Sequence, residues 1–168
     1  MKPLAFHITW GTYGMRLHGD PRRTVDRTNT EYGTPVLGFD GERWEAMKEK
    51  LKFPPRALTR EQRVFIEGII PAICDRGGWQ YRVGAAGPDH VHVLLTSKHD
   101  PSVIRRLLKR WAGDELSGRW AISAGETWWA EGGSIRWVAD EKYLQDVTGY
   151  VKRQREERSG RGRPGSAL

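Results

Sequence analysis

The stretch Trp79–Thr96, with the sequence WQYRVGAAGPDHVHVLLT, decides the fold. Two runs rich in β-branched and aromatic residues, Trp79–Ala85 and His90–Thr96, flank the segment Ala86-Gly87-Pro88-Asp89. A short connection made of turn-forming residues between two such runs is typical of a β-hairpin. The sequence therefore predicts that these two strands lie side by side and antiparallel.

The segments on either side of the hairpin carry helix signals. Thr59-Arg-Glu-Gln62 has the form of a capping box and predicts a helix that ends at Gly77-Gly78. After the hairpin, Asp100-Pro101 supplies an N-cap and a first-turn proline for a second helix. The remaining predicted elements are an opening strand at Phe6–Tyr13, a loop and strand at Thr127–Val138, and a last helix from Asp140 to about Arg158. This order predicts an α+β fold, in which helices cover an antiparallel-rich sheet.

A chain of 168 residues is long enough for one domain with a real core. We expect a single domain over residues 1–158. Residues 14–57 are rich in Gly, Pro, Arg and Thr and predict a loop-rich insertion with one short helix at Glu42–Lys52. Residues 159–168 predict a disordered basic tail.

The amino-acid composition indicates which kinds of molecule the protein is expected to bind. The formal net charge of +7 favours polyanions, and eight tryptophans and five tyrosines supply faces on which nucleic-acid bases can stack. No apolar run approaches the ~18–20 residues that cross a bilayer, so we expect no membrane association. The single cysteine, Cys74, predicts a small buried hydrophobe and suits a reducing cytoplasm.

The hairpin contains a histidine pair, His90-Val91-His92. Residues two apart in a strand point to the same face, so the two side chains leave the sheet about 6.6 Å apart. Imidazoles at that spacing can converge on one metal ion, while Val91 and Val93 are buried on the other face. On its own, a His-x-His pattern is also compatible with two histidines on a solvent-exposed strand face.

The last predicted helix contains Tyr150-Val-Lys-Arg-Gln154. Residues four apart on a helix lie on one face, so the phenol and the amide can stand together. A phenol has an ordinary pKa near 10 and needs a base, a cation or an activated leaving group to act as a nucleophile. Taken alone, Tyr150 is also compatible with the packing face of the helix.

Together these segments resemble the HUH superfamily of single-strand nucleases. More narrowly, the chain resembles the single-tyrosine transposases, including the REP-associated tyrosine transposases. In that family two histidines flank a hydrophobic residue, and a Tyr-x-x-x-Gln or Tyr-x-x-x-Asn pattern follows on a late helix. His90-Val91-His92 and Tyr150-x-x-x-Gln154 match that pattern in order and spacing. The resemblance covers about Leu4–Trp10 and Leu58–Glu156 and is thin across residues 14–57.

The resemblance implies a ferredoxin-like antiparallel sheet with helices packed on it, the HUH nuclease fold. It implies a divalent ion, Mg²⁺ or Mn²⁺, with His90, His92 and Gln154 as metal ligands. Tyr150 would be the catalytic nucleophile that attacks single-stranded DNA and forms a 5′-phosphotyrosine link. Members typically act as dimers on palindromes that fold as hairpins. We therefore expect a homodimer, a hairpin or palindromic single-stranded DNA, and a prokaryotic cytoplasm with nucleoid association.

The residues that contact DNA and the alternative functions are likewise expectations from the sequence. The candidate nucleic-acid-binding residues are Arg105, Arg106, Lys109, Arg110, Lys152 and Arg153. Tyr143 is the weaker nucleophile candidate, because the residue four positions later is Val147 rather than an amide. Three other functions remain open: a domesticated relative that binds DNA hairpins, a non-catalytic DNA- or RNA-binding module of the same fold, and a metal-dependent hydrolase of small phosphates.

Overall fold

The computed structural model describes residues 2–15 and 41–158, the side chains of 156–158 excepted. Its helices and strands follow the order β1 (Ala5–Gly11), α1 (Gly41–Glu49), α2 (Arg60–Gly77), β2 (Gln80–Ala86), β3 (His90–Thr96), α3 (Pro101–Arg119), β4 (Ser134–Val138) and α4 (Glu141–Arg158). The expected elements are therefore all present, with small shifts at their ends.

The four strands form one antiparallel sheet in the order β2-β3-β1-β4. The predicted hairpin is the β2–β3 pair, and β1 lies between β3 and β4. With α2 between β1 and β2 and α3 between β3 and β4, this is the connectivity of a ferredoxin-like sheet. The predicted α+β class and the ferredoxin-like arrangement are confirmed.

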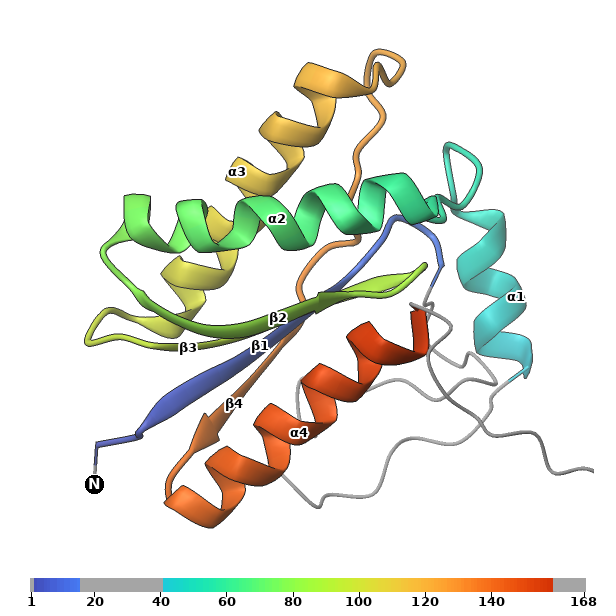
Figure 1. Ribbon diagram of the computed structural model, residues 1–168. Helices are drawn as coiled ribbons and strands as arrows, with labels where there is room; N and C mark the ends of the chain where they lie inside the picture. Colours follow the sequence, from blue (N-terminus) through green and yellow to red (C-terminus); the bar gives the residue numbers. More distant parts are fainter. Residues whose placement is uncertain (1, 16–40, 159–168) are drawn as a thin grey trace, which may run out of the picture.

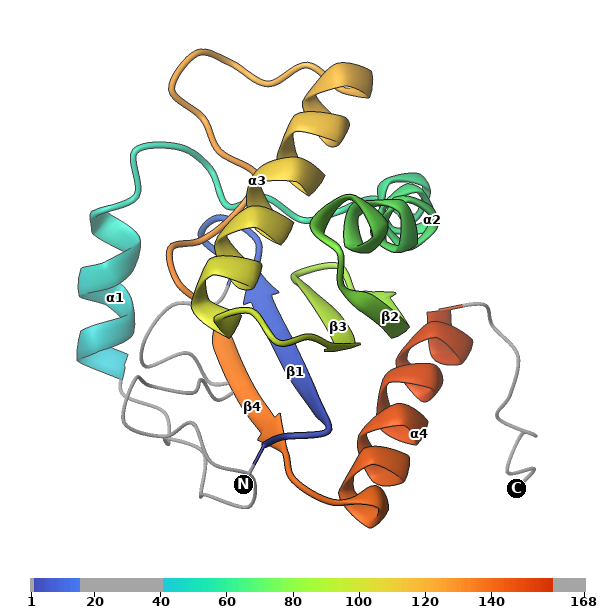
Figure 2. The same ribbon diagram turned by 90° about the vertical axis from the view of Figure 1, so that its left-hand side faces the viewer.

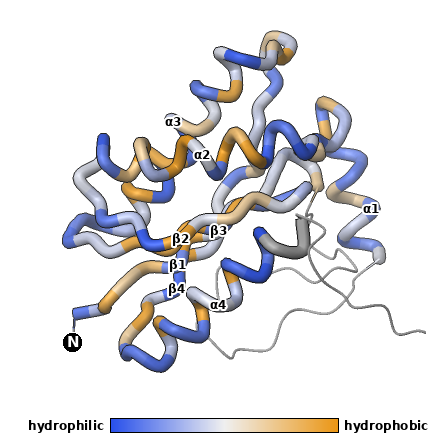
Figure 3. The backbone as a smooth tube through the Cα atoms, in the orientation of Figure 1, coloured by the Kyte–Doolittle hydropathy of each residue, from blue (hydrophilic) through white to orange (hydrophobic). Residues whose placement is uncertain are grey.

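Helices cover both faces of the sheet. Figures 1 and 2 show α2 and α3 on one side and α4 on the other. Alternate strand residues such as Phe6, Ile8 and Trp10 pack against α2 and α3 in the larger of two hydrophobic cores. The smaller core lies on the α4 side and combines Ala5, Val83, Ala85, Leu94 and Val138 of the sheet with Leu144, Val147 and Val151 of α4. Figure 3 shows hydrophobic stretches in orange along the strands and α2.

The residues that the sequence predicted to cap the ends of helices do so in the structure. Thr59 caps α2 by accepting from the backbone N–H of Gln62, whose side chain in turn accepts from the backbone N–H of Thr59. Gly78, in the left-handed conformation at φ 69°, ends α2. Asp100 caps α3 by accepting from the backbone N–H of Ser102. Cys74 is fully buried, as predicted.

The region expected as an insertion is described only in part. The short helix predicted at Glu42–Lys52 is present as α1 and ends three residues earlier. None of its residues is buried. Residues 16–40 and the predicted disordered tail, 159–168, lie outside the described residues. No described helix combines the length and the apolar character needed to cross a membrane.

An ion pair links the two helical layers at the β2 edge. Glu67 of α2 is buried and accepts from the backbone N–H of Ala86, the last residue of β2. Its other carboxylate oxygen lies 3.5 Å from Nε of Arg155 on α4. Because a buried carboxylate must be compensated, this arrangement fixes α4 relative to α2 and the sheet.

Candidate active site

The sheet brings three polar side chains of the α4 face together. Thr9 of β1 is paired with His92 of β3 across the sheet. His7, two residues before Thr9, points to the same face. Thr9 Oγ1 lies 2.9 Å from His92 Nδ1, and His7 Nε2 lies 3.1 Å from the same atom. His7 and His92 are both buried, with their rings stacked at a centroid distance of 5.2 Å.

His90 stands beside His92 as the sequence predicted. Their ring centroids are 4.5 Å apart and the rings are nearly perpendicular. His90 Nδ1 contacts the carboxylate of Asp89, the residue that precedes it. Asp89 is itself buried, and its backbone carbonyl accepts from the N–H of Thr12. The turn before β3 therefore fixes His90 as well as starting the strand.

Tyr150 reaches this cluster from α4. Its ring centroid lies 5.6 Å from that of His92 and 6.4 Å from that of His7, edge to face in both cases. Its neighbours Val147 and Val151 are buried in the smaller core, whereas Tyr150 itself is 42% exposed. The phenol therefore lies next to buried imidazoles and remains open to solvent. This position is compatible with both interpretations that the sequence left open.

The two histidines have the hydrogen-bonding partners expected of metal ligands. Metal-binding histidines usually donate their second ring N–H to a carboxylate or another acceptor, which fixes the tautomer. The Nδ1 atoms of His90 and His92 contact Asp89 and Thr9, respectively. A proton on each Nδ1 places the lone pair on Nε2. The donor chemistry of this pair therefore fits a divalent ion.

In the part of the chain that the structure describes, no group of three or more His, Cys, Asp and Glu side chains is arranged to hold a metal. The predicted set differs from such a group, since its third member is the amide of Gln154. Gln154 is half-buried and lies one helical turn after Tyr150, with exposed Lys152 and Arg153 between them.

The cations predicted to bind DNA along α3 divide into two pairs. Arg106 and Arg110 are exposed. Arg105 instead donates to the backbone carbonyl of Gly133, and Lys109 Nζ donates to the carbonyls of Ala130 and Gly132. Burial, followed by the charge of Arg105, lowers the pKa of Lys109 to about 8. Arg105 and Lys109 thus hold the loop before β4, a role that the sequence did not predict.

Sequence reasoning missed other residues around the histidines. His7 and Thr9 belong to a strand recognised only as the first strand of the fold, and their contact with His92 depends on the register between β1 and β3. Arg136 of β4 is paired with His7 and is half-buried on the same face. Alternation along the opening strand could have placed His7 and Thr9 on one face, but not next to His92.

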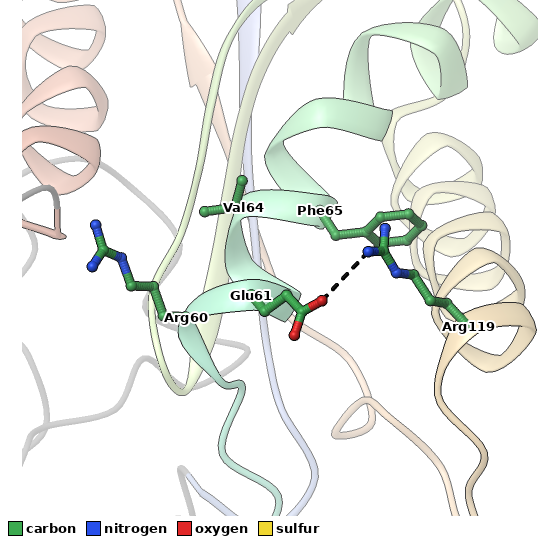
Figure 4. Close-up of a pocket in the computed structure, with 5 residues that line it drawn as sticks. All are labelled: Arg60, Glu61, Val64, Phe65 and Arg119. Atoms are coloured by element: carbon green, nitrogen blue, oxygen red, sulfur yellow. Dashed lines mark hydrogen bonds and ion pairs between the residues drawn. The ribbon is translucent and has the colours of Figure 1, made fainter.

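A separate hollow lies on the other side of the molecule. It measures about 450 Å³ and is lined by residues of α2 together with Arg119 of α3 (Figure 4). Glu61 and Arg119 form an exposed ion pair across it, with Nη2 and Oε1 3.4 Å apart. None of the predicted site residues lines this hollow. The histidine and tyrosine cluster under α4 shares no residue with it.

No protein-family model and no curated protein matches the chain. The solved structures that resemble the chain include a crystal structure from Deinococcus radiodurans R1 described as a "putative transposase", with 16% identity, 92% of each chain covered and a TM-score of 0.46. A similarity of this degree does not show which family the chain belongs to.

The environment of His7 predicts a pH dependence of stability. Burial, with a smaller contribution from the charge of Arg136, lowers the pKa of His7 from 6.5 to about 4. Between these values the unfolded chain binds more protons than the folded one, so stability falls as the pH drops from 6.5 to 4. The loss attributable to His7 is about 3 kcal/mol.

Urea unfolding in EDTA, at several pH values, measures this loss. His7→Gln, which stays neutral, should lose about 3 kcal/mol less than the wild type over the same pH range. Parallel stability curves for the two proteins would show that His7 titrates normally.

Proposed function

We propose that this protein is a transposase-type, metal-dependent endonuclease and strand-transferase that acts on single-stranded DNA. The observation that carries the proposal is the position of Tyr150, whose ring lies 5.6 Å from that of His92 while 42% of the residue is exposed. A nucleophile must be reachable by its substrate and close to the groups that activate it. Tyr150 is partly exposed and lies beside His92, a proposed ligand of the activating ion.

In this proposal His90, His92 and Gln154 hold one divalent ion, Mg²⁺ or Mn²⁺. When bound, the ion supplies Lewis-acid polarisation of the scissile phosphate. The protein's own part is to keep the two imidazoles in place through Asp89 and Thr9 and to present the phenol beside them. Imidazole ligands suit Mn²⁺ better than Mg²⁺.

Cleavage would be a transesterification at phosphorus. The phenolic oxygen of Tyr150 forms a bond to phosphorus, and the bond from phosphorus to the 3′ oxygen breaks. The phenol loses its proton and the departing oxygen takes one up, which leaves a 3′-hydroxyl and a 5′-phosphotyrosine link. Since the link is again a phosphodiester, attack by another 3′-hydroxyl rejoins the strand without ATP.

We propose that basic residues of α3 and α4 bind the DNA backbone. The net charge of +7 favours phosphates. Lys152 and Arg153 follow Tyr150 directly and are exposed, and so are Arg106 and Arg110 of α3. Arg105 and Lys109 stay in the proposed set, although each also bonds the loop before β4. The proposed substrate is hairpin or palindromic DNA, and the proposed acting species is a homodimer.

Incubation of the protein with single-stranded hairpin oligonucleotides and Mn²⁺ tests this function. We expect a covalent protein–DNA species on a denaturing gel. It should carry a 3′-end label but not a 5′-end label, because tyrosine retains the 5′ phosphate of the downstream fragment. EDTA should prevent its formation.

Two other outcomes would contradict the proposal. An oligonucleotide that is bound but never linked would favour a non-catalytic hairpin-binding protein of the same fold. Adduct formation that is unaffected by EDTA would remove the metal from the mechanism.

A further inference from the structure

The side chains of His7, Thr9 and His92 contact one another in a closed triangle. Thr9 Oγ1 and His7 Nε2 lie 2.9 and 3.1 Å from His92 Nδ1. Thr9 Oγ1 and His7 Nε2 are 3.4 Å from each other. The triangle is built into the sheet, because Thr9 is the direct cross-strand partner of His92 and His7 shares its face. None of these atoms belongs to the proposed ligand set.

When both imidazoles are neutral, His92 Nδ1 either donates within the triangle or accepts within it. In the first case, His92 Nδ1–H donates to Thr9 Oγ1, whose hydroxyl donates to His7 Nε2, or it donates directly to His7 Nε2. In the second, His92 Nδ1 accepts from Thr9 or His7, and the proton of His92 sits on Nε2. Only the first arrangement gives His92 Nε2 a lone pair with which to bind a cation.

We propose that Thr9 and His7 are positioning residues that hold His92 in the Nδ1–H tautomer and so prepare its Nε2 for the metal. The inference rests on the proposed function, in which His92 is a ligand. Thr9 can act as relay because a hydroxyl both accepts and donates. His90 reaches the same tautomer by another route, through the carboxylate of Asp89. The two ligands are therefore oriented by separate partners.

The position of Thr9 allows a matched pair of variants. Thr9→Val removes the hydroxyl, keeps the side-chain shape and retains a residue that favours strands. Thr9→Ser keeps the hydroxyl and removes a methyl group. A role in packing predicts that serine is the more harmful change, whereas a role in hydrogen bonding predicts that valine is.

Two measurements on the full-length protein test the proposal without DNA. Long-range ¹H–¹⁵N spectra of the metal-free protein above pH 7 report the tautomer of His92, whose signals a His92→Gln variant identifies. Electron paramagnetic resonance titration gives the affinity for Mn²⁺. We expect the Nδ1–H tautomer in the wild type and in Thr9→Ser. We expect Thr9→Val to populate the Nε2–H tautomer and to bind Mn²⁺ about 10–100-fold more weakly.

The results of these experiments distinguish a failure of the positioning role from a failure of the proposed nuclease function. An Nε2–H tautomer in the wild type, or unchanged Mn²⁺ affinity in Thr9→Val, would overturn the positioning role even if the wild type forms a DNA adduct. Conversely, the expected tautomers and affinities without any adduct would support the positioning role and refute the nuclease. Thermal unfolding of both variants identifies a loss of binding that is due to misfolding.

Discussion

Replacing Tyr150 by phenylalanine is expected to abolish the covalent protein–DNA adduct. The change removes the single oxygen that would attack phosphorus and leaves the ring beside His92. Loss of a catalytic nucleophile lowers turnover by at least about 10³-fold. Because Tyr150 is 42% exposed and its ring remains, folding should be nearly unaffected. The measurement is the initial rate of adduct formation with a labelled hairpin oligonucleotide and Mn²⁺.

Tyr143→Phe is the matched control for this experiment. It makes the same chemical change two turns earlier on α4, where the ring packs against the smaller core. We expect this variant to form the adduct at close to the wild-type rate. If Tyr143→Phe loses the adduct and Tyr150→Phe keeps it, the nucleophile is misassigned. Adduct formation by both variants would point to a nucleophile other than these two tyrosines.

Gly133→Ala should give the largest loss of stability among the variants considered. Gly133 has a φ of 133°, and an added Cβ would lie 2.5 Å from the backbone oxygen of Thr9. Backbone strain and overpacking together should cost about 3 kcal/mol or more. For a chain of this size, that corresponds to a fall in melting temperature of roughly 6–12 °C. Thermal unfolding followed by circular dichroism measures it.

Gly132→Ala distinguishes the cost of backbone strain from the cost of overpacking. Gly132 also has a positive φ, 76°, but a Cβ there would meet no atom within 4 Å. This variant should lose only the cost of the left-handed conformation, about 1 kcal/mol. Equal losses in the two variants would mean that the contact with β1 is not the source of the effect. Because Gly133 lies against Thr9, its variant should also weaken Mn²⁺ binding, whereas Gly132→Ala should not.

The elements of the fold were predictable because their signals are local. The capping box at Thr59, the N-cap at Asp100 and the turn before His90 each fix an element end within a few residues. Strand order is different, since it depends on which strands meet after the chain has folded. The position of β1 between β3 and β4 was not predicted by periodicity, and the resemblance implied only a ferredoxin-like sheet.

The residues of the candidate site also differ in whether local sequence patterns predict them. His90 and His92 on one strand, and Tyr150 with Gln154 on one helix, are spaced by local geometry and were predicted. The contact between Tyr150 and His92 joins residues that are 58 positions apart, and the resemblance suggested it. His7 and Thr9 could not be found, because their role depends on the register of β1 against β3. The same holds for Lys109, whose carbonyl partners belong to a distant loop.

The unequal sizes of the two cores have a consequence for dynamics. The sheet, α2 and α3 share the larger core, whereas α4 is fastened by the smaller one and by the Arg155–Glu67 pair. Segments with fewer buried contacts open locally at a lower free-energy cost than the whole domain. A partial opening of α4 would carry Tyr150 away from His92 while the strands that hold both histidines stay folded. The proposed nucleophile thus lies on the long helix that packs against the smaller core.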